Sequence, residues 1–470
     1  MKSTTPVFAV IGRVNKGKSS IVSTLLEDDS VLIESAAGTT RESREYPVRV
    51  DGQVLVKLVD TPGFQQAPRA LAWLREHEVS AANRREVIEH FLETYAGTED
   101  YTDECRLLAP ILQGAGILYV VDGAKPFRRN YEAEMEILRW TGQPRMALVN
   151  KIGNNDYLDK WRPALDQYFS IVREFNAQAV SFKDRIRLLE SFRELHEPWR
   201  ENLDQAISHL ERDWDRRKRE SAHIIASLLV HQLTFTRELI LKRYEKPEDY
   251  KLSLEQDFHD ALRKKEAEAR KAIEMLYQHR RLEIIQTELQ KPIFMQDLFS
   301  DTTWSMLGLS PKQLIGFGAV AGATFGGMMD AAVGGTSFMA GSLLGGLVGA
   351  GSAAFYSAQR LATIENVKNY IAGGQGLKIG PIKNDNFPWI VLDRALLHYH
   401  NVRDLTHARR ERLDLRSSSE KSGIVTRFAL ADKKELSRLF TAIRKKASGD
   451  SSRYEKQLEQ KIYRLIQDEQ

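Results

Sequence analysis

Four residues near the start of the chain have types and spacing that suit phosphate chemistry. Gly12, Gly17, Lys18 and Ser19 follow the apolar run from Val7 to Ile11 as G-x-x-x-x-G-K-S. Glycines let backbone N–H groups curl around phosphates, a lysine reaches the terminal phosphates, and a serine hydroxyl is a ligand for Mg²⁺. The strand, the loop and the helical segment KSSIVSTLLE come in the required order. The sequence therefore predicts a phosphate-binding loop rather than a chance glycine-rich turn.

Two further segments offer groups for a terminal phosphate and its metal ion. The polar stretch GTTRE carries the hydroxyls of Thr39 and Thr40, which are placed to close over a γ-phosphate. The apolar run VLVKLVD ends in Asp60, and Gly63 follows as the last residue of D-T-P-G. A strand that ends in D-x-x-G puts a carboxylate beside Mg²⁺ and a glycine N–H beside the γ-phosphate. The expected Mg²⁺ ligands are Ser19, Thr40 and Asp60.

The motifs GRVNKGKSS, GTTRE, DTPGF and VNKIG, in this order and spacing, resemble the first four G motifs of the TrmE/Era/EngA class of bacterial GTPases. AVSFK stands where that class has its S-A-K loop, so the resemblance covers residues 1 to about 185. It implies a six-stranded α/β P-loop fold, slow GTP hydrolysis and binding of Mg²⁺. It also implies that Asn15 helps to hold a K⁺ ion in place of an arginine finger. Phe64 stands where Ras-like proteins have a water-orienting glutamine, so the sequence reveals no general base.

The fourth motif departs from the class at one position. Gly153 replaces the aspartate that accepts hydrogen bonds from guanine N1–H and N2–H₂, although Asn150 and Lys151 are present. A base that leaves buried polar groups unpaired is rejected, so loss of the aspartate is expected to weaken guanine selectivity. The alternative is that Asp156, in the stretch GNND, brings its carboxylate back to the base. The backbone N–H of Phe182 remains as a donor to guanine O6.

The resemblance implies one set of nucleotide-binding residues. They are Gly12, Asn15, Lys16, Gly17, Lys18, Ser19, Ser20, Thr39, Thr40, Asp60, Gly63, Asn150, Lys151, Ser181, Phe182 and Lys183.

The segments around and after this domain are expected to be helical. Residues 65–113 show helical periodicity and form an enlarged switch II region in this interpretation. Residues 186–300 are charged and leucine-studded, which favours a helical bundle or coiled-coil arm, with a plain spacer helix as the alternative. The basic run from Arg216 to Arg219 is interpreted as a solvated helix face. Residues 361–470 return to a mixed, mostly helical pattern.

Residues 301–360 form the second distinctive region, a glycine-rich apolar hairpin. Between residues 313 and 359 the only charged residue is Asp330, and glycines recur every fourth residue on both sides of it. They are Gly318, Gly322, Gly326, Gly341, Gly345 and Gly349. Glycine within a helix costs roughly 1 kcal/mol relative to alanine, and close helix contact offsets that cost in membrane helix pairs. The pattern predicts a membrane-inserting glycine-zipper hairpin, and a tightly packed soluble hairpin is the alternative.

Composition narrows the function classes. The chain has 470 residues and a net charge of +4 from 68 basic and 64 acidic residues, so no strong field draws it towards nucleic acid. Cys105 is the single cysteine, which excludes a disulfide framework. Without an apolar N-terminal signal segment, the protein is expected in the cytoplasm, associated with or inserted into the inner membrane.

The sequence thus predicts a Mg²⁺-dependent GTPase whose switch drives a helical effector region at the cytoplasmic membrane face. The C-terminal region resembles bacterial GTPases that carry a domain of unknown function there. Two alternatives stay open: a nucleotide-binding membrane scaffold with negligible turnover, and a GTPase associated with RNA or the ribosome. The expected partners are GTP and GDP, with a membrane lipid, a membrane protein or a second copy of the chain as further candidates.

Overall fold

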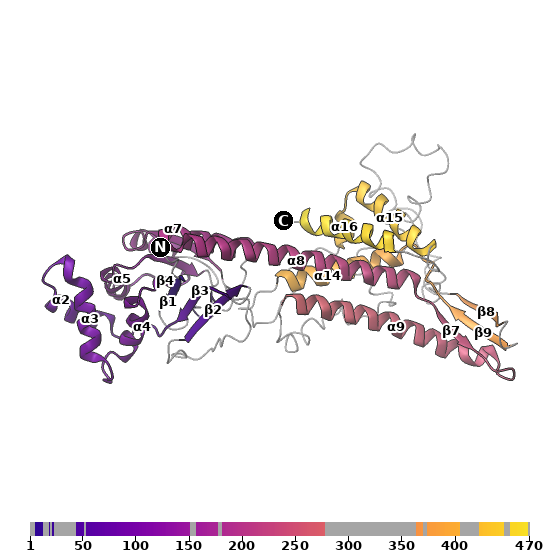
Figure 1. Ribbon diagram of the computed structural model, residues 1–470, viewed down its shortest axis with the longest axis horizontal. Helices are drawn as coiled ribbons and strands as arrows, with labels where there is room; N and C mark the ends of the chain where they lie inside the picture. The colour runs from indigo at the N-terminus through magenta and orange to yellow at the C-terminus, as the bar shows by residue number, and fades with distance from the viewer. Residues whose placement is uncertain are drawn as a thin grey trace, which may run out of the picture. The chain divides into compact units, whose positions relative to one another are not determined.

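The chain divides into two compact units, the first running through Asp215 and the second beginning at Arg216 (Figure 1). The computed structural model describes residues 5–12, 18, 21–22, 44–50, 53–150, 157–176, 181–277, 363–369, 374–404, 423–445 and 452–468. The predicted glycine-rich hairpin, residues 301–360, lies outside the described residues, so it remains a prediction from the sequence.

The first unit is built on a six-stranded sheet with the strand order β2-β3-β1-β4-β5-β6. Its strands are β1 (Val7–Ile11), β2 (Arg44–Val50), β3 (Gln53–Asp60), β4 (Gly116–Asp122), β5 (Arg145–Asn150) and β6 (Ile171–Phe175). All neighbours are parallel except β2, which pairs antiparallel with β3. The carboxyl ends of β1, β3, β4 and β5 therefore meet at one edge, where ligands bind in open α/β sheets. The α/β fold expected from the sequence is confirmed.

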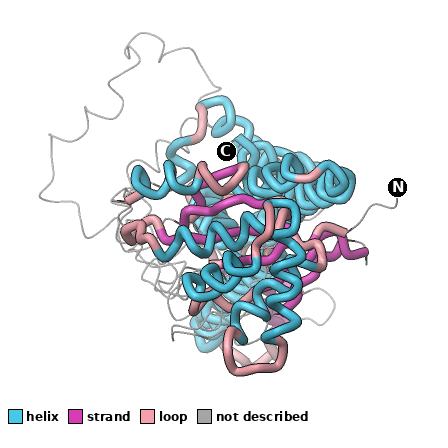
Figure 2. Tube along the Cα trace, turned by 90° about the vertical axis from the view of Figure 1, so that its left-hand side faces the viewer, coloured by secondary structure: helices cyan, strands magenta, loops and turns pink. Residues whose placement is uncertain are grey.

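Alternation along β1 shows how the sheet separates two hydrophobic cores. Successive side chains of a strand point to opposite faces. Ala9 and Ile11 join the core formed with the helices from α2 to α6, whereas Phe8 and Val10 join the core formed with α7. Seen from the end of the unit where α2 and α3 lie, helices stand in front of the strands (Figure 2).

The helices of this unit that the structure describes from end to end, before residue 200, lie within residues 67–195. They are α2 (Ala67–His77), α3 (Arg84–Tyr95), α4 (Thr102–Leu112), α5 (Asn130–Trp140), α6 (Leu158–Leu165) and α7 (Phe182–Leu195). Of these, α2, α3 and α4 make up the segment predicted as an enlarged switch II region. Trp73 of α2 packs edge-on against Phe91 of α3, with ring centroids 5.2 Å apart. The inserted helices thus form a packed extension of the core rather than a long loop.

A glycine in β4 allows the opposite face to close. Trp199, in a short 3-10 turn after α7, packs so near β4 that a Cβ at Gly116 would lie 2.4 Å from its ring. Phe8 of β1 stacks on Phe192 of α7 and meets Trp199 edge-on, with centroid distances of 4.0 and 4.9 Å. Only glycine leaves room for the indole at this point.

The second unit is mostly helical. Within the described residues, its helices are the later part of α8 (Arg200–Thr234), α9 (Pro247–Leu276), α14 (Phe387–Asp404), α15 (Leu430–Lys445) and α16 (Ser452–Asp468). A small antiparallel sheet has the order β7-β9-β8, with β7 (Arg237–Ile240), β8 (Ile364–Asn369) and β9 (Gly374–Ile379). The strand β7 lies inside a region that the sequence predicts as helical throughout. It is extended because it pairs with β9, a partner remote in the sequence.

Helix α14 carries charged and polar side chains into the core of this unit. Arg394 Nε donates to Glu266 Oε1 of α9 at 2.7 Å, and the two side chains are 2% and 7% exposed. Asp393 Oδ1 accepts a hydrogen bond from the backbone N–H of Val425 at 2.8 Å. Burial raises the pKa of Asp393 to about 6, and the N–H groups of Val425 and Ile424 oppose that rise.

The imidazole of His398, one turn further along α14, is perturbed in the opposite direction. Burial lowers the pKa of His398 to about 4, and the charge of Arg270 lowers it further. His398 Nε2 lies 3.3 Å from the Arg270 carbonyl and 3.4 Å from Glu274 Oε1. Because the ring is neutral near pH 7, its contact with Glu274 is that of a neutral imidazole rather than an ion pair.

Two residues of the basic run in α8 differ from the prediction. Arg217 and Lys218 are each only 5% exposed, although Arg216 and Arg219 are exposed. The Arg217 guanidinium lies 5.8 Å from the ring centroid of Tyr277. The interpretation of the whole run as a solvated face was therefore wrong, since the second unit covers one side of α8 at Arg217 and Lys218.

Among the helices in the described ranges, none combines the length and apolar character that a membrane crossing needs.

Candidate nucleotide-binding site

The first glycine of the phosphate-loop motif packs directly against β4. Gly12 follows β1 with φ +153°, and a Cβ at this position would lie 2.3 Å from the Val120 carbonyl oxygen. A side chain would meet backbone that cannot rotate away. The motif needs glycine here because the chain must leave β1 in contact with the neighbouring strand.

Lys18 turns back onto the start of the loop. Its side chain is 8% exposed, and Nζ donates to the Gly12 carbonyl oxygen at 2.9 Å. Burial lowers the pKa of Lys18, while the charges of Asp60 and Glu134 act in the opposite sense. Tyr119 of β4 donates its hydroxyl hydrogen to Glu134 Oε2 of α5 at 2.7 Å, which orients that carboxylate. A buried ammonium group is thus placed at the edge of the sheet with two carboxylates near it.

The end of β3 lies beside the end of β1. Val10 and Asp60 are partners in the register of these strands, and Asp60 is 4% exposed. The buried hydroxyl of Thr61 donates to the Val10 carbonyl oxygen at 2.8 Å, which ties the D-T-P-G segment to β1. Carboxylate oxygen is the ligand type that Mg²⁺ prefers, so the Asp60 side chain fits the metal that the motif implies. Gly63 is also buried.

Asn150 ends β5 at the same edge of the sheet. It is fully buried, and its carbonyl oxygen accepts a hydrogen bond from the N–H of Gly123 at 3.0 Å. Its partner in the strand register is Asp122, the last residue of β4. Lys151, Gly153 and the following residues through 156 lie outside the described residues.

The SFK segment forms the start of α7. Ser181 caps this helix, since its Oγ accepts from the Asp184 N–H at 3.2 Å and its own N–H donates to Asp184 Oδ2 at 3.1 Å. The Phe182 ring stacks on Trp214 of α8, with centroids 4.5 Å apart and planes 5° from parallel. Lys183 is exposed. This stacking ties the predicted base-contacting loop to the following helix.

The structure brings some of the predicted residues together and leaves others undescribed. Gly12, Lys18 and Asp60 form one cluster, and the buried Asn150 ends a strand at the same edge of the sheet. Eight of the predicted residues lie outside the described residues, namely Asn15, Lys16, Gly17, Ser19, Ser20, Thr39, Thr40 and Lys151.

Sequence reasoning missed three residues next to this site. Glu134 and Trp214 come from charged helical stretches, where the pattern indicates a solvated face. Glu104 is of the same kind, yet it is 1% exposed and contacts the segment after Gly63. No local signal marks any of the three, because each contacts a partner that is distant in the sequence.

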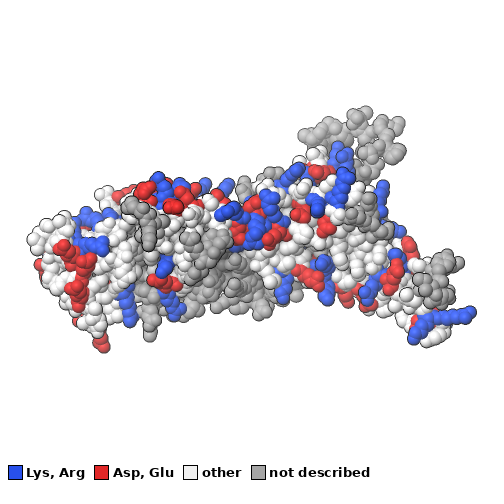
Figure 3. Space-filling view, in the orientation of Figure 1, with Lys and Arg blue, Asp and Glu red and all other residues white. Residues whose placement is uncertain are grey.

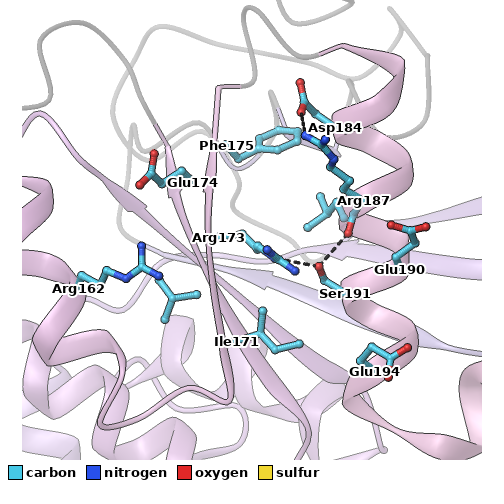
Figure 4. Close-up of a pocket in the computed structure, with 12 residues that line it drawn as sticks. Arg162, Ile171, Arg173, Glu174, Phe175, Asp184, Arg187, Glu190, Ser191 and Glu194 are labelled. Carbon is cyan, nitrogen blue, oxygen red and sulfur yellow. Dashed lines mark hydrogen bonds and ion pairs between the residues drawn. The ribbon is translucent and has the colours of Figure 1, made fainter.

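A groove of about 510 Å³ lies elsewhere in this unit, between β6 and α7 (Figure 4). Arg173 donates to Ser191 Oγ at 3.1 Å within it. Its lining carries charges of both signs, from Arg162, Arg173, Glu174, Asp184, Arg187, Glu190 and Glu194. None of the predicted nucleotide-binding residues lines it, so it is not the candidate site. Within the described ranges, no cluster of three or more His, Cys, Asp or Glu residues is arranged to hold a metal ion.

Comparison with known proteins finds two family models that match successive parts of the chain. A family described as 50S ribosome-binding GTPase matches residues 7–151. GTPase Der of Lactobacillus helveticus is 32% identical over 181 residues, which are 36% of this chain and 39% of the relative. The tRNA modification GTPase MnmE of Sulfurimonas denitrificans is 31% identical over 149 residues, 30% of this chain and 33% of the relative. The chain therefore spans well under half the length of these relatives.

Among solved structures, an Aquifex aeolicus Era variant bound to GDP and AlF4⁻ is 16% identical, with a TM-score of 0.27 over 52% of this chain and 74% of that chain. This TM-score is too low to support a structural comparison of the two chains. The remaining match covers most of the sequence: a family described as domain of unknown function (DUF3482) matches residues 162–469. The chain belongs to this DUF3482 family and carries a P-loop GTPase domain before the region that defines the family.

Proposed function

We propose that residues 1–185 bind GTP with Mg²⁺ and hydrolyse it. The observation that carries this proposal is Lys18, whose buried ammonium group donates to the Gly12 carbonyl and is flanked by the Asp60 carboxylate. A lysine held in this way at the end of a G-x-x-x-x-G-K-S loop is placed to meet the terminal phosphates of a bound triphosphate. The similarity to Der and MnmE, both named as GTPases, supports the same reaction.

Each predicted residue then has a role. Lys18 contacts the terminal phosphates, and the N–H of Gly63 meets the γ-phosphate. Asp60 holds Mg²⁺ together with Ser19 and Thr40. When bound, Mg²⁺ supplies positive charge that offsets the negative charge on the phosphates. The remaining loop residues, Gly12, Asn15, Lys16, Gly17 and Ser20, surround the phosphates through backbone and side-chain groups.

Phe64 takes no part in orienting the attacking water. Its side chain is 4% exposed and belongs to the core under α2. An apolar, buried group has no hydrogen-bonding atom to offer. Hydrolysis would therefore depend on phosphate positioning, and a K⁺ ion, if held with the help of Asn15, would supply the charge that an arginine finger gives.

Base recognition rests on fewer contacts than in the GTPase class that this domain resembles. Asn150 and Lys151 pack beside the base, and the N–H of Phe182 donates to guanine O6. Gly153 has no side chain to accept from N1–H and N2–H₂. Guanine is therefore preferred over adenine less strongly than an aspartate at that position would give.

The remaining regions form the effector part. In this proposal residues 186–300 and 361–470 transmit the nucleotide state, and residues 301–360 insert as a hairpin into a membrane at its cytoplasmic face. The repeated glycines and the single charge at Asp330 between residues 313 and 359 support insertion. The partner there is membrane lipid or a membrane protein, and pairing of two copies of the chain is compatible with it.

A second candidate is association with RNA or the ribosome. The description of the family that matches residues 7–151 favours it. Charge opposes it, because basic and acidic side chains are interspersed over the face shown in Figure 3 and the net charge is +4. Binding to RNA that falls steeply with added salt would favour this candidate over the membrane proposal.

Phosphate release from saturating GTP tests the leading proposal. The wild-type chain should turn over faster in K⁺ than in Na⁺. Lys18→Ala should lose about 100-fold or more, as expected when a group that stabilises developing charge is removed. Lys57→Ala is the control, because this partly exposed lysine pairs with Glu45 away from the loop. Unchanged turnover in Lys18→Ala would remove the assignment, and tight binding without release would favour the scaffold alternative.

A further inference from the structure

The segment that follows Gly63 is held by a buried carboxylate from α4. Glu104 Oε1 accepts hydrogen bonds from the backbone N–H groups of Gln65 at 2.8 Å and Gln66 at 2.6 Å. The Glu104 side chain is 1% exposed. A carboxylate is expensive to bury without partners, and backbone N–H groups are among the groups that compensate it best.

These two donors lie at the junction between the phosphate site and the inserted helices. Gly63 comes two residues before Gln65, and Gln66 is the residue that caps α2. No side chain caps that helix locally, so the Glu104 carboxylate supplies the negative charge that a helix N-terminus favours. A single carboxylate thus fixes both the end of the D-T-P-G-F segment and the start of α2.

The chain reaches this arrangement through a strained turn. Tyr101, directly before α4, has φ +55°, a left-handed conformation that no other described non-glycine residue adopts. Its ring is 8% exposed and packs edge-on against Tyr95 and Phe91, with centroid distances of 4.7 and 5.1 Å. Strained backbone persists where the surroundings hold it, and such positions cluster at functional sites. Here the strain lies three residues before Glu104 and directs the start of α4 towards the switch segment.

We infer that Glu104 is a positioning residue, which holds the backbone of residues 65 and 66 so that the N–H of Gly63 is correctly placed for the γ-phosphate. The other anchors of this segment are the Thr61 hydroxyl on β1 and the buried Phe64 ring. Neither reaches the residues after Phe64. The inserted helices from α2 to α4 are therefore coupled to the γ-phosphate position through Glu104. This inference rests on the proposed GTPase function.

Glu104→Gln and Glu104→Ala test the inference, with Asp103→Ala as the matched control. Asp103 is the neighbouring acidic residue in the first turn of the same helix, so its removal also takes a charge from the α4 N-terminus. GDP has no γ-phosphate, so its affinity should be unchanged in all three variants. GTP hydrolysis should fall about 10-fold to 100-fold in Glu104→Ala, less in Glu104→Gln and not in Asp103→Ala.

Hydrogen exchange at the amides of Gln65 and Gln66 gives a readout that does not depend on turnover. Both should exchange at least about tenfold faster in Glu104→Ala than in the wild type or in Asp103→Ala. An equal loss of GDP and GTP affinity would overturn the inference, because it would show a general structural role. Unchanged exchange at both amides would overturn it too. If the wild type fails to hydrolyse GTP but the exchange result holds, the proposed function fails while the contact itself stands.

Discussion

Replacing Gly12 by alanine should disable the phosphate loop by pushing it away from β4. A Cβ at this residue would lie 2.3 Å from the Val120 carbonyl oxygen, whereas ordinary contacts begin at 3.4 Å. Relief of the clash needs a displacement of about 1.1 Å, and the opposing atom is backbone of a central strand. The carbonyl oxygen of Gly12 is also the acceptor for Lys18, so the lysine moves with it.

A displacement of about 1 Å at a site that positions reacting groups can lower the rate about 100-fold. We therefore expect Gly12→Ala to lose about two orders of magnitude in kcat/KM for GTP. The accompanying loss of stability should be modest, about 1 to 3 kcal/mol, since it combines backbone strain with overpacking at one point. The two effects are measured separately, by phosphate release and by urea unfolding.

Gly97→Ala is the control for backbone strain without a clash. Gly97 has φ +78°, and no atom lies within 4 Å of a Cβ built there. Alanine in this conformation should cost about 1 to 2 kcal/mol of stability and leave turnover unchanged. If Gly12→Ala hydrolyses GTP as well as Gly97→Ala does, the tight approach of the loop to β4 has no part in the function.

Three further predictions address the base, the hairpin and the second unit. Gly153→Asp should raise discrimination of GTP over ATP by about 1 to 3 kcal/mol in competition binding; strong selectivity in the wild type that Asp156→Ala abolishes would contradict this. Deletion of residues 313–359 should release the chain from salt-washed membranes with its nucleotide binding intact; a soluble wild type and an aggregated deletion would refute insertion. Burial raises the pKa of Asp393 to about 6, so proton uptake by the folded chain should add up to about 3 kcal/mol to the free energy of unfolding as pH falls from 6 to 4. Burial lowers the pKa of His398 to about 4, so proton uptake by the unfolded chain should remove a similar amount as pH falls from 6.5 to 4. In Asp393→Asn, the free energy of unfolding measured with urea should therefore fall more steeply on acidification than in the wild type. Identical pH profiles for variant and wild type would show that Asp393 does not titrate in this range.

The sequence was sufficient for those parts of the first unit whose determinants are local. Glycine spacing, a lysine and an apolar strand predict the phosphate loop, and the structure places Gly12, Lys18 and Asp60 together as that pattern requires. The parallel sheet follows for the same reason, since each strand is a short buried apolar run between helical segments. The C-terminal helices were also predictable from their periodicity.

The remaining features depend on partners remote in the chain. Glu104 has the same sequence signature as a surface glutamate, and only the return of the chain to residues 65 and 66 buries it. The strand β7 is a short run between long helices that becomes extended through pairing with β9. Arg217 and Lys218 lie in a charged run, yet their own unit covers them. Periodicity along one segment contains no information about contacts of this kind.

A single-turnover experiment measures GTP binding and GTP hydrolysis by the chain in one sample. The whole chain, in excess over GTP labelled at the γ-phosphate, is followed for bound nucleotide and released phosphate in the same sample. We expect the wild type to bind GTP and to release phosphate with Mg²⁺ but not after chelation, and Lys18→Ala to do neither. Equal phosphate release by wild type and Lys18→Ala, or no nucleotide binding by the wild type, would contradict the assignment of residues 1–185 as a working GTPase.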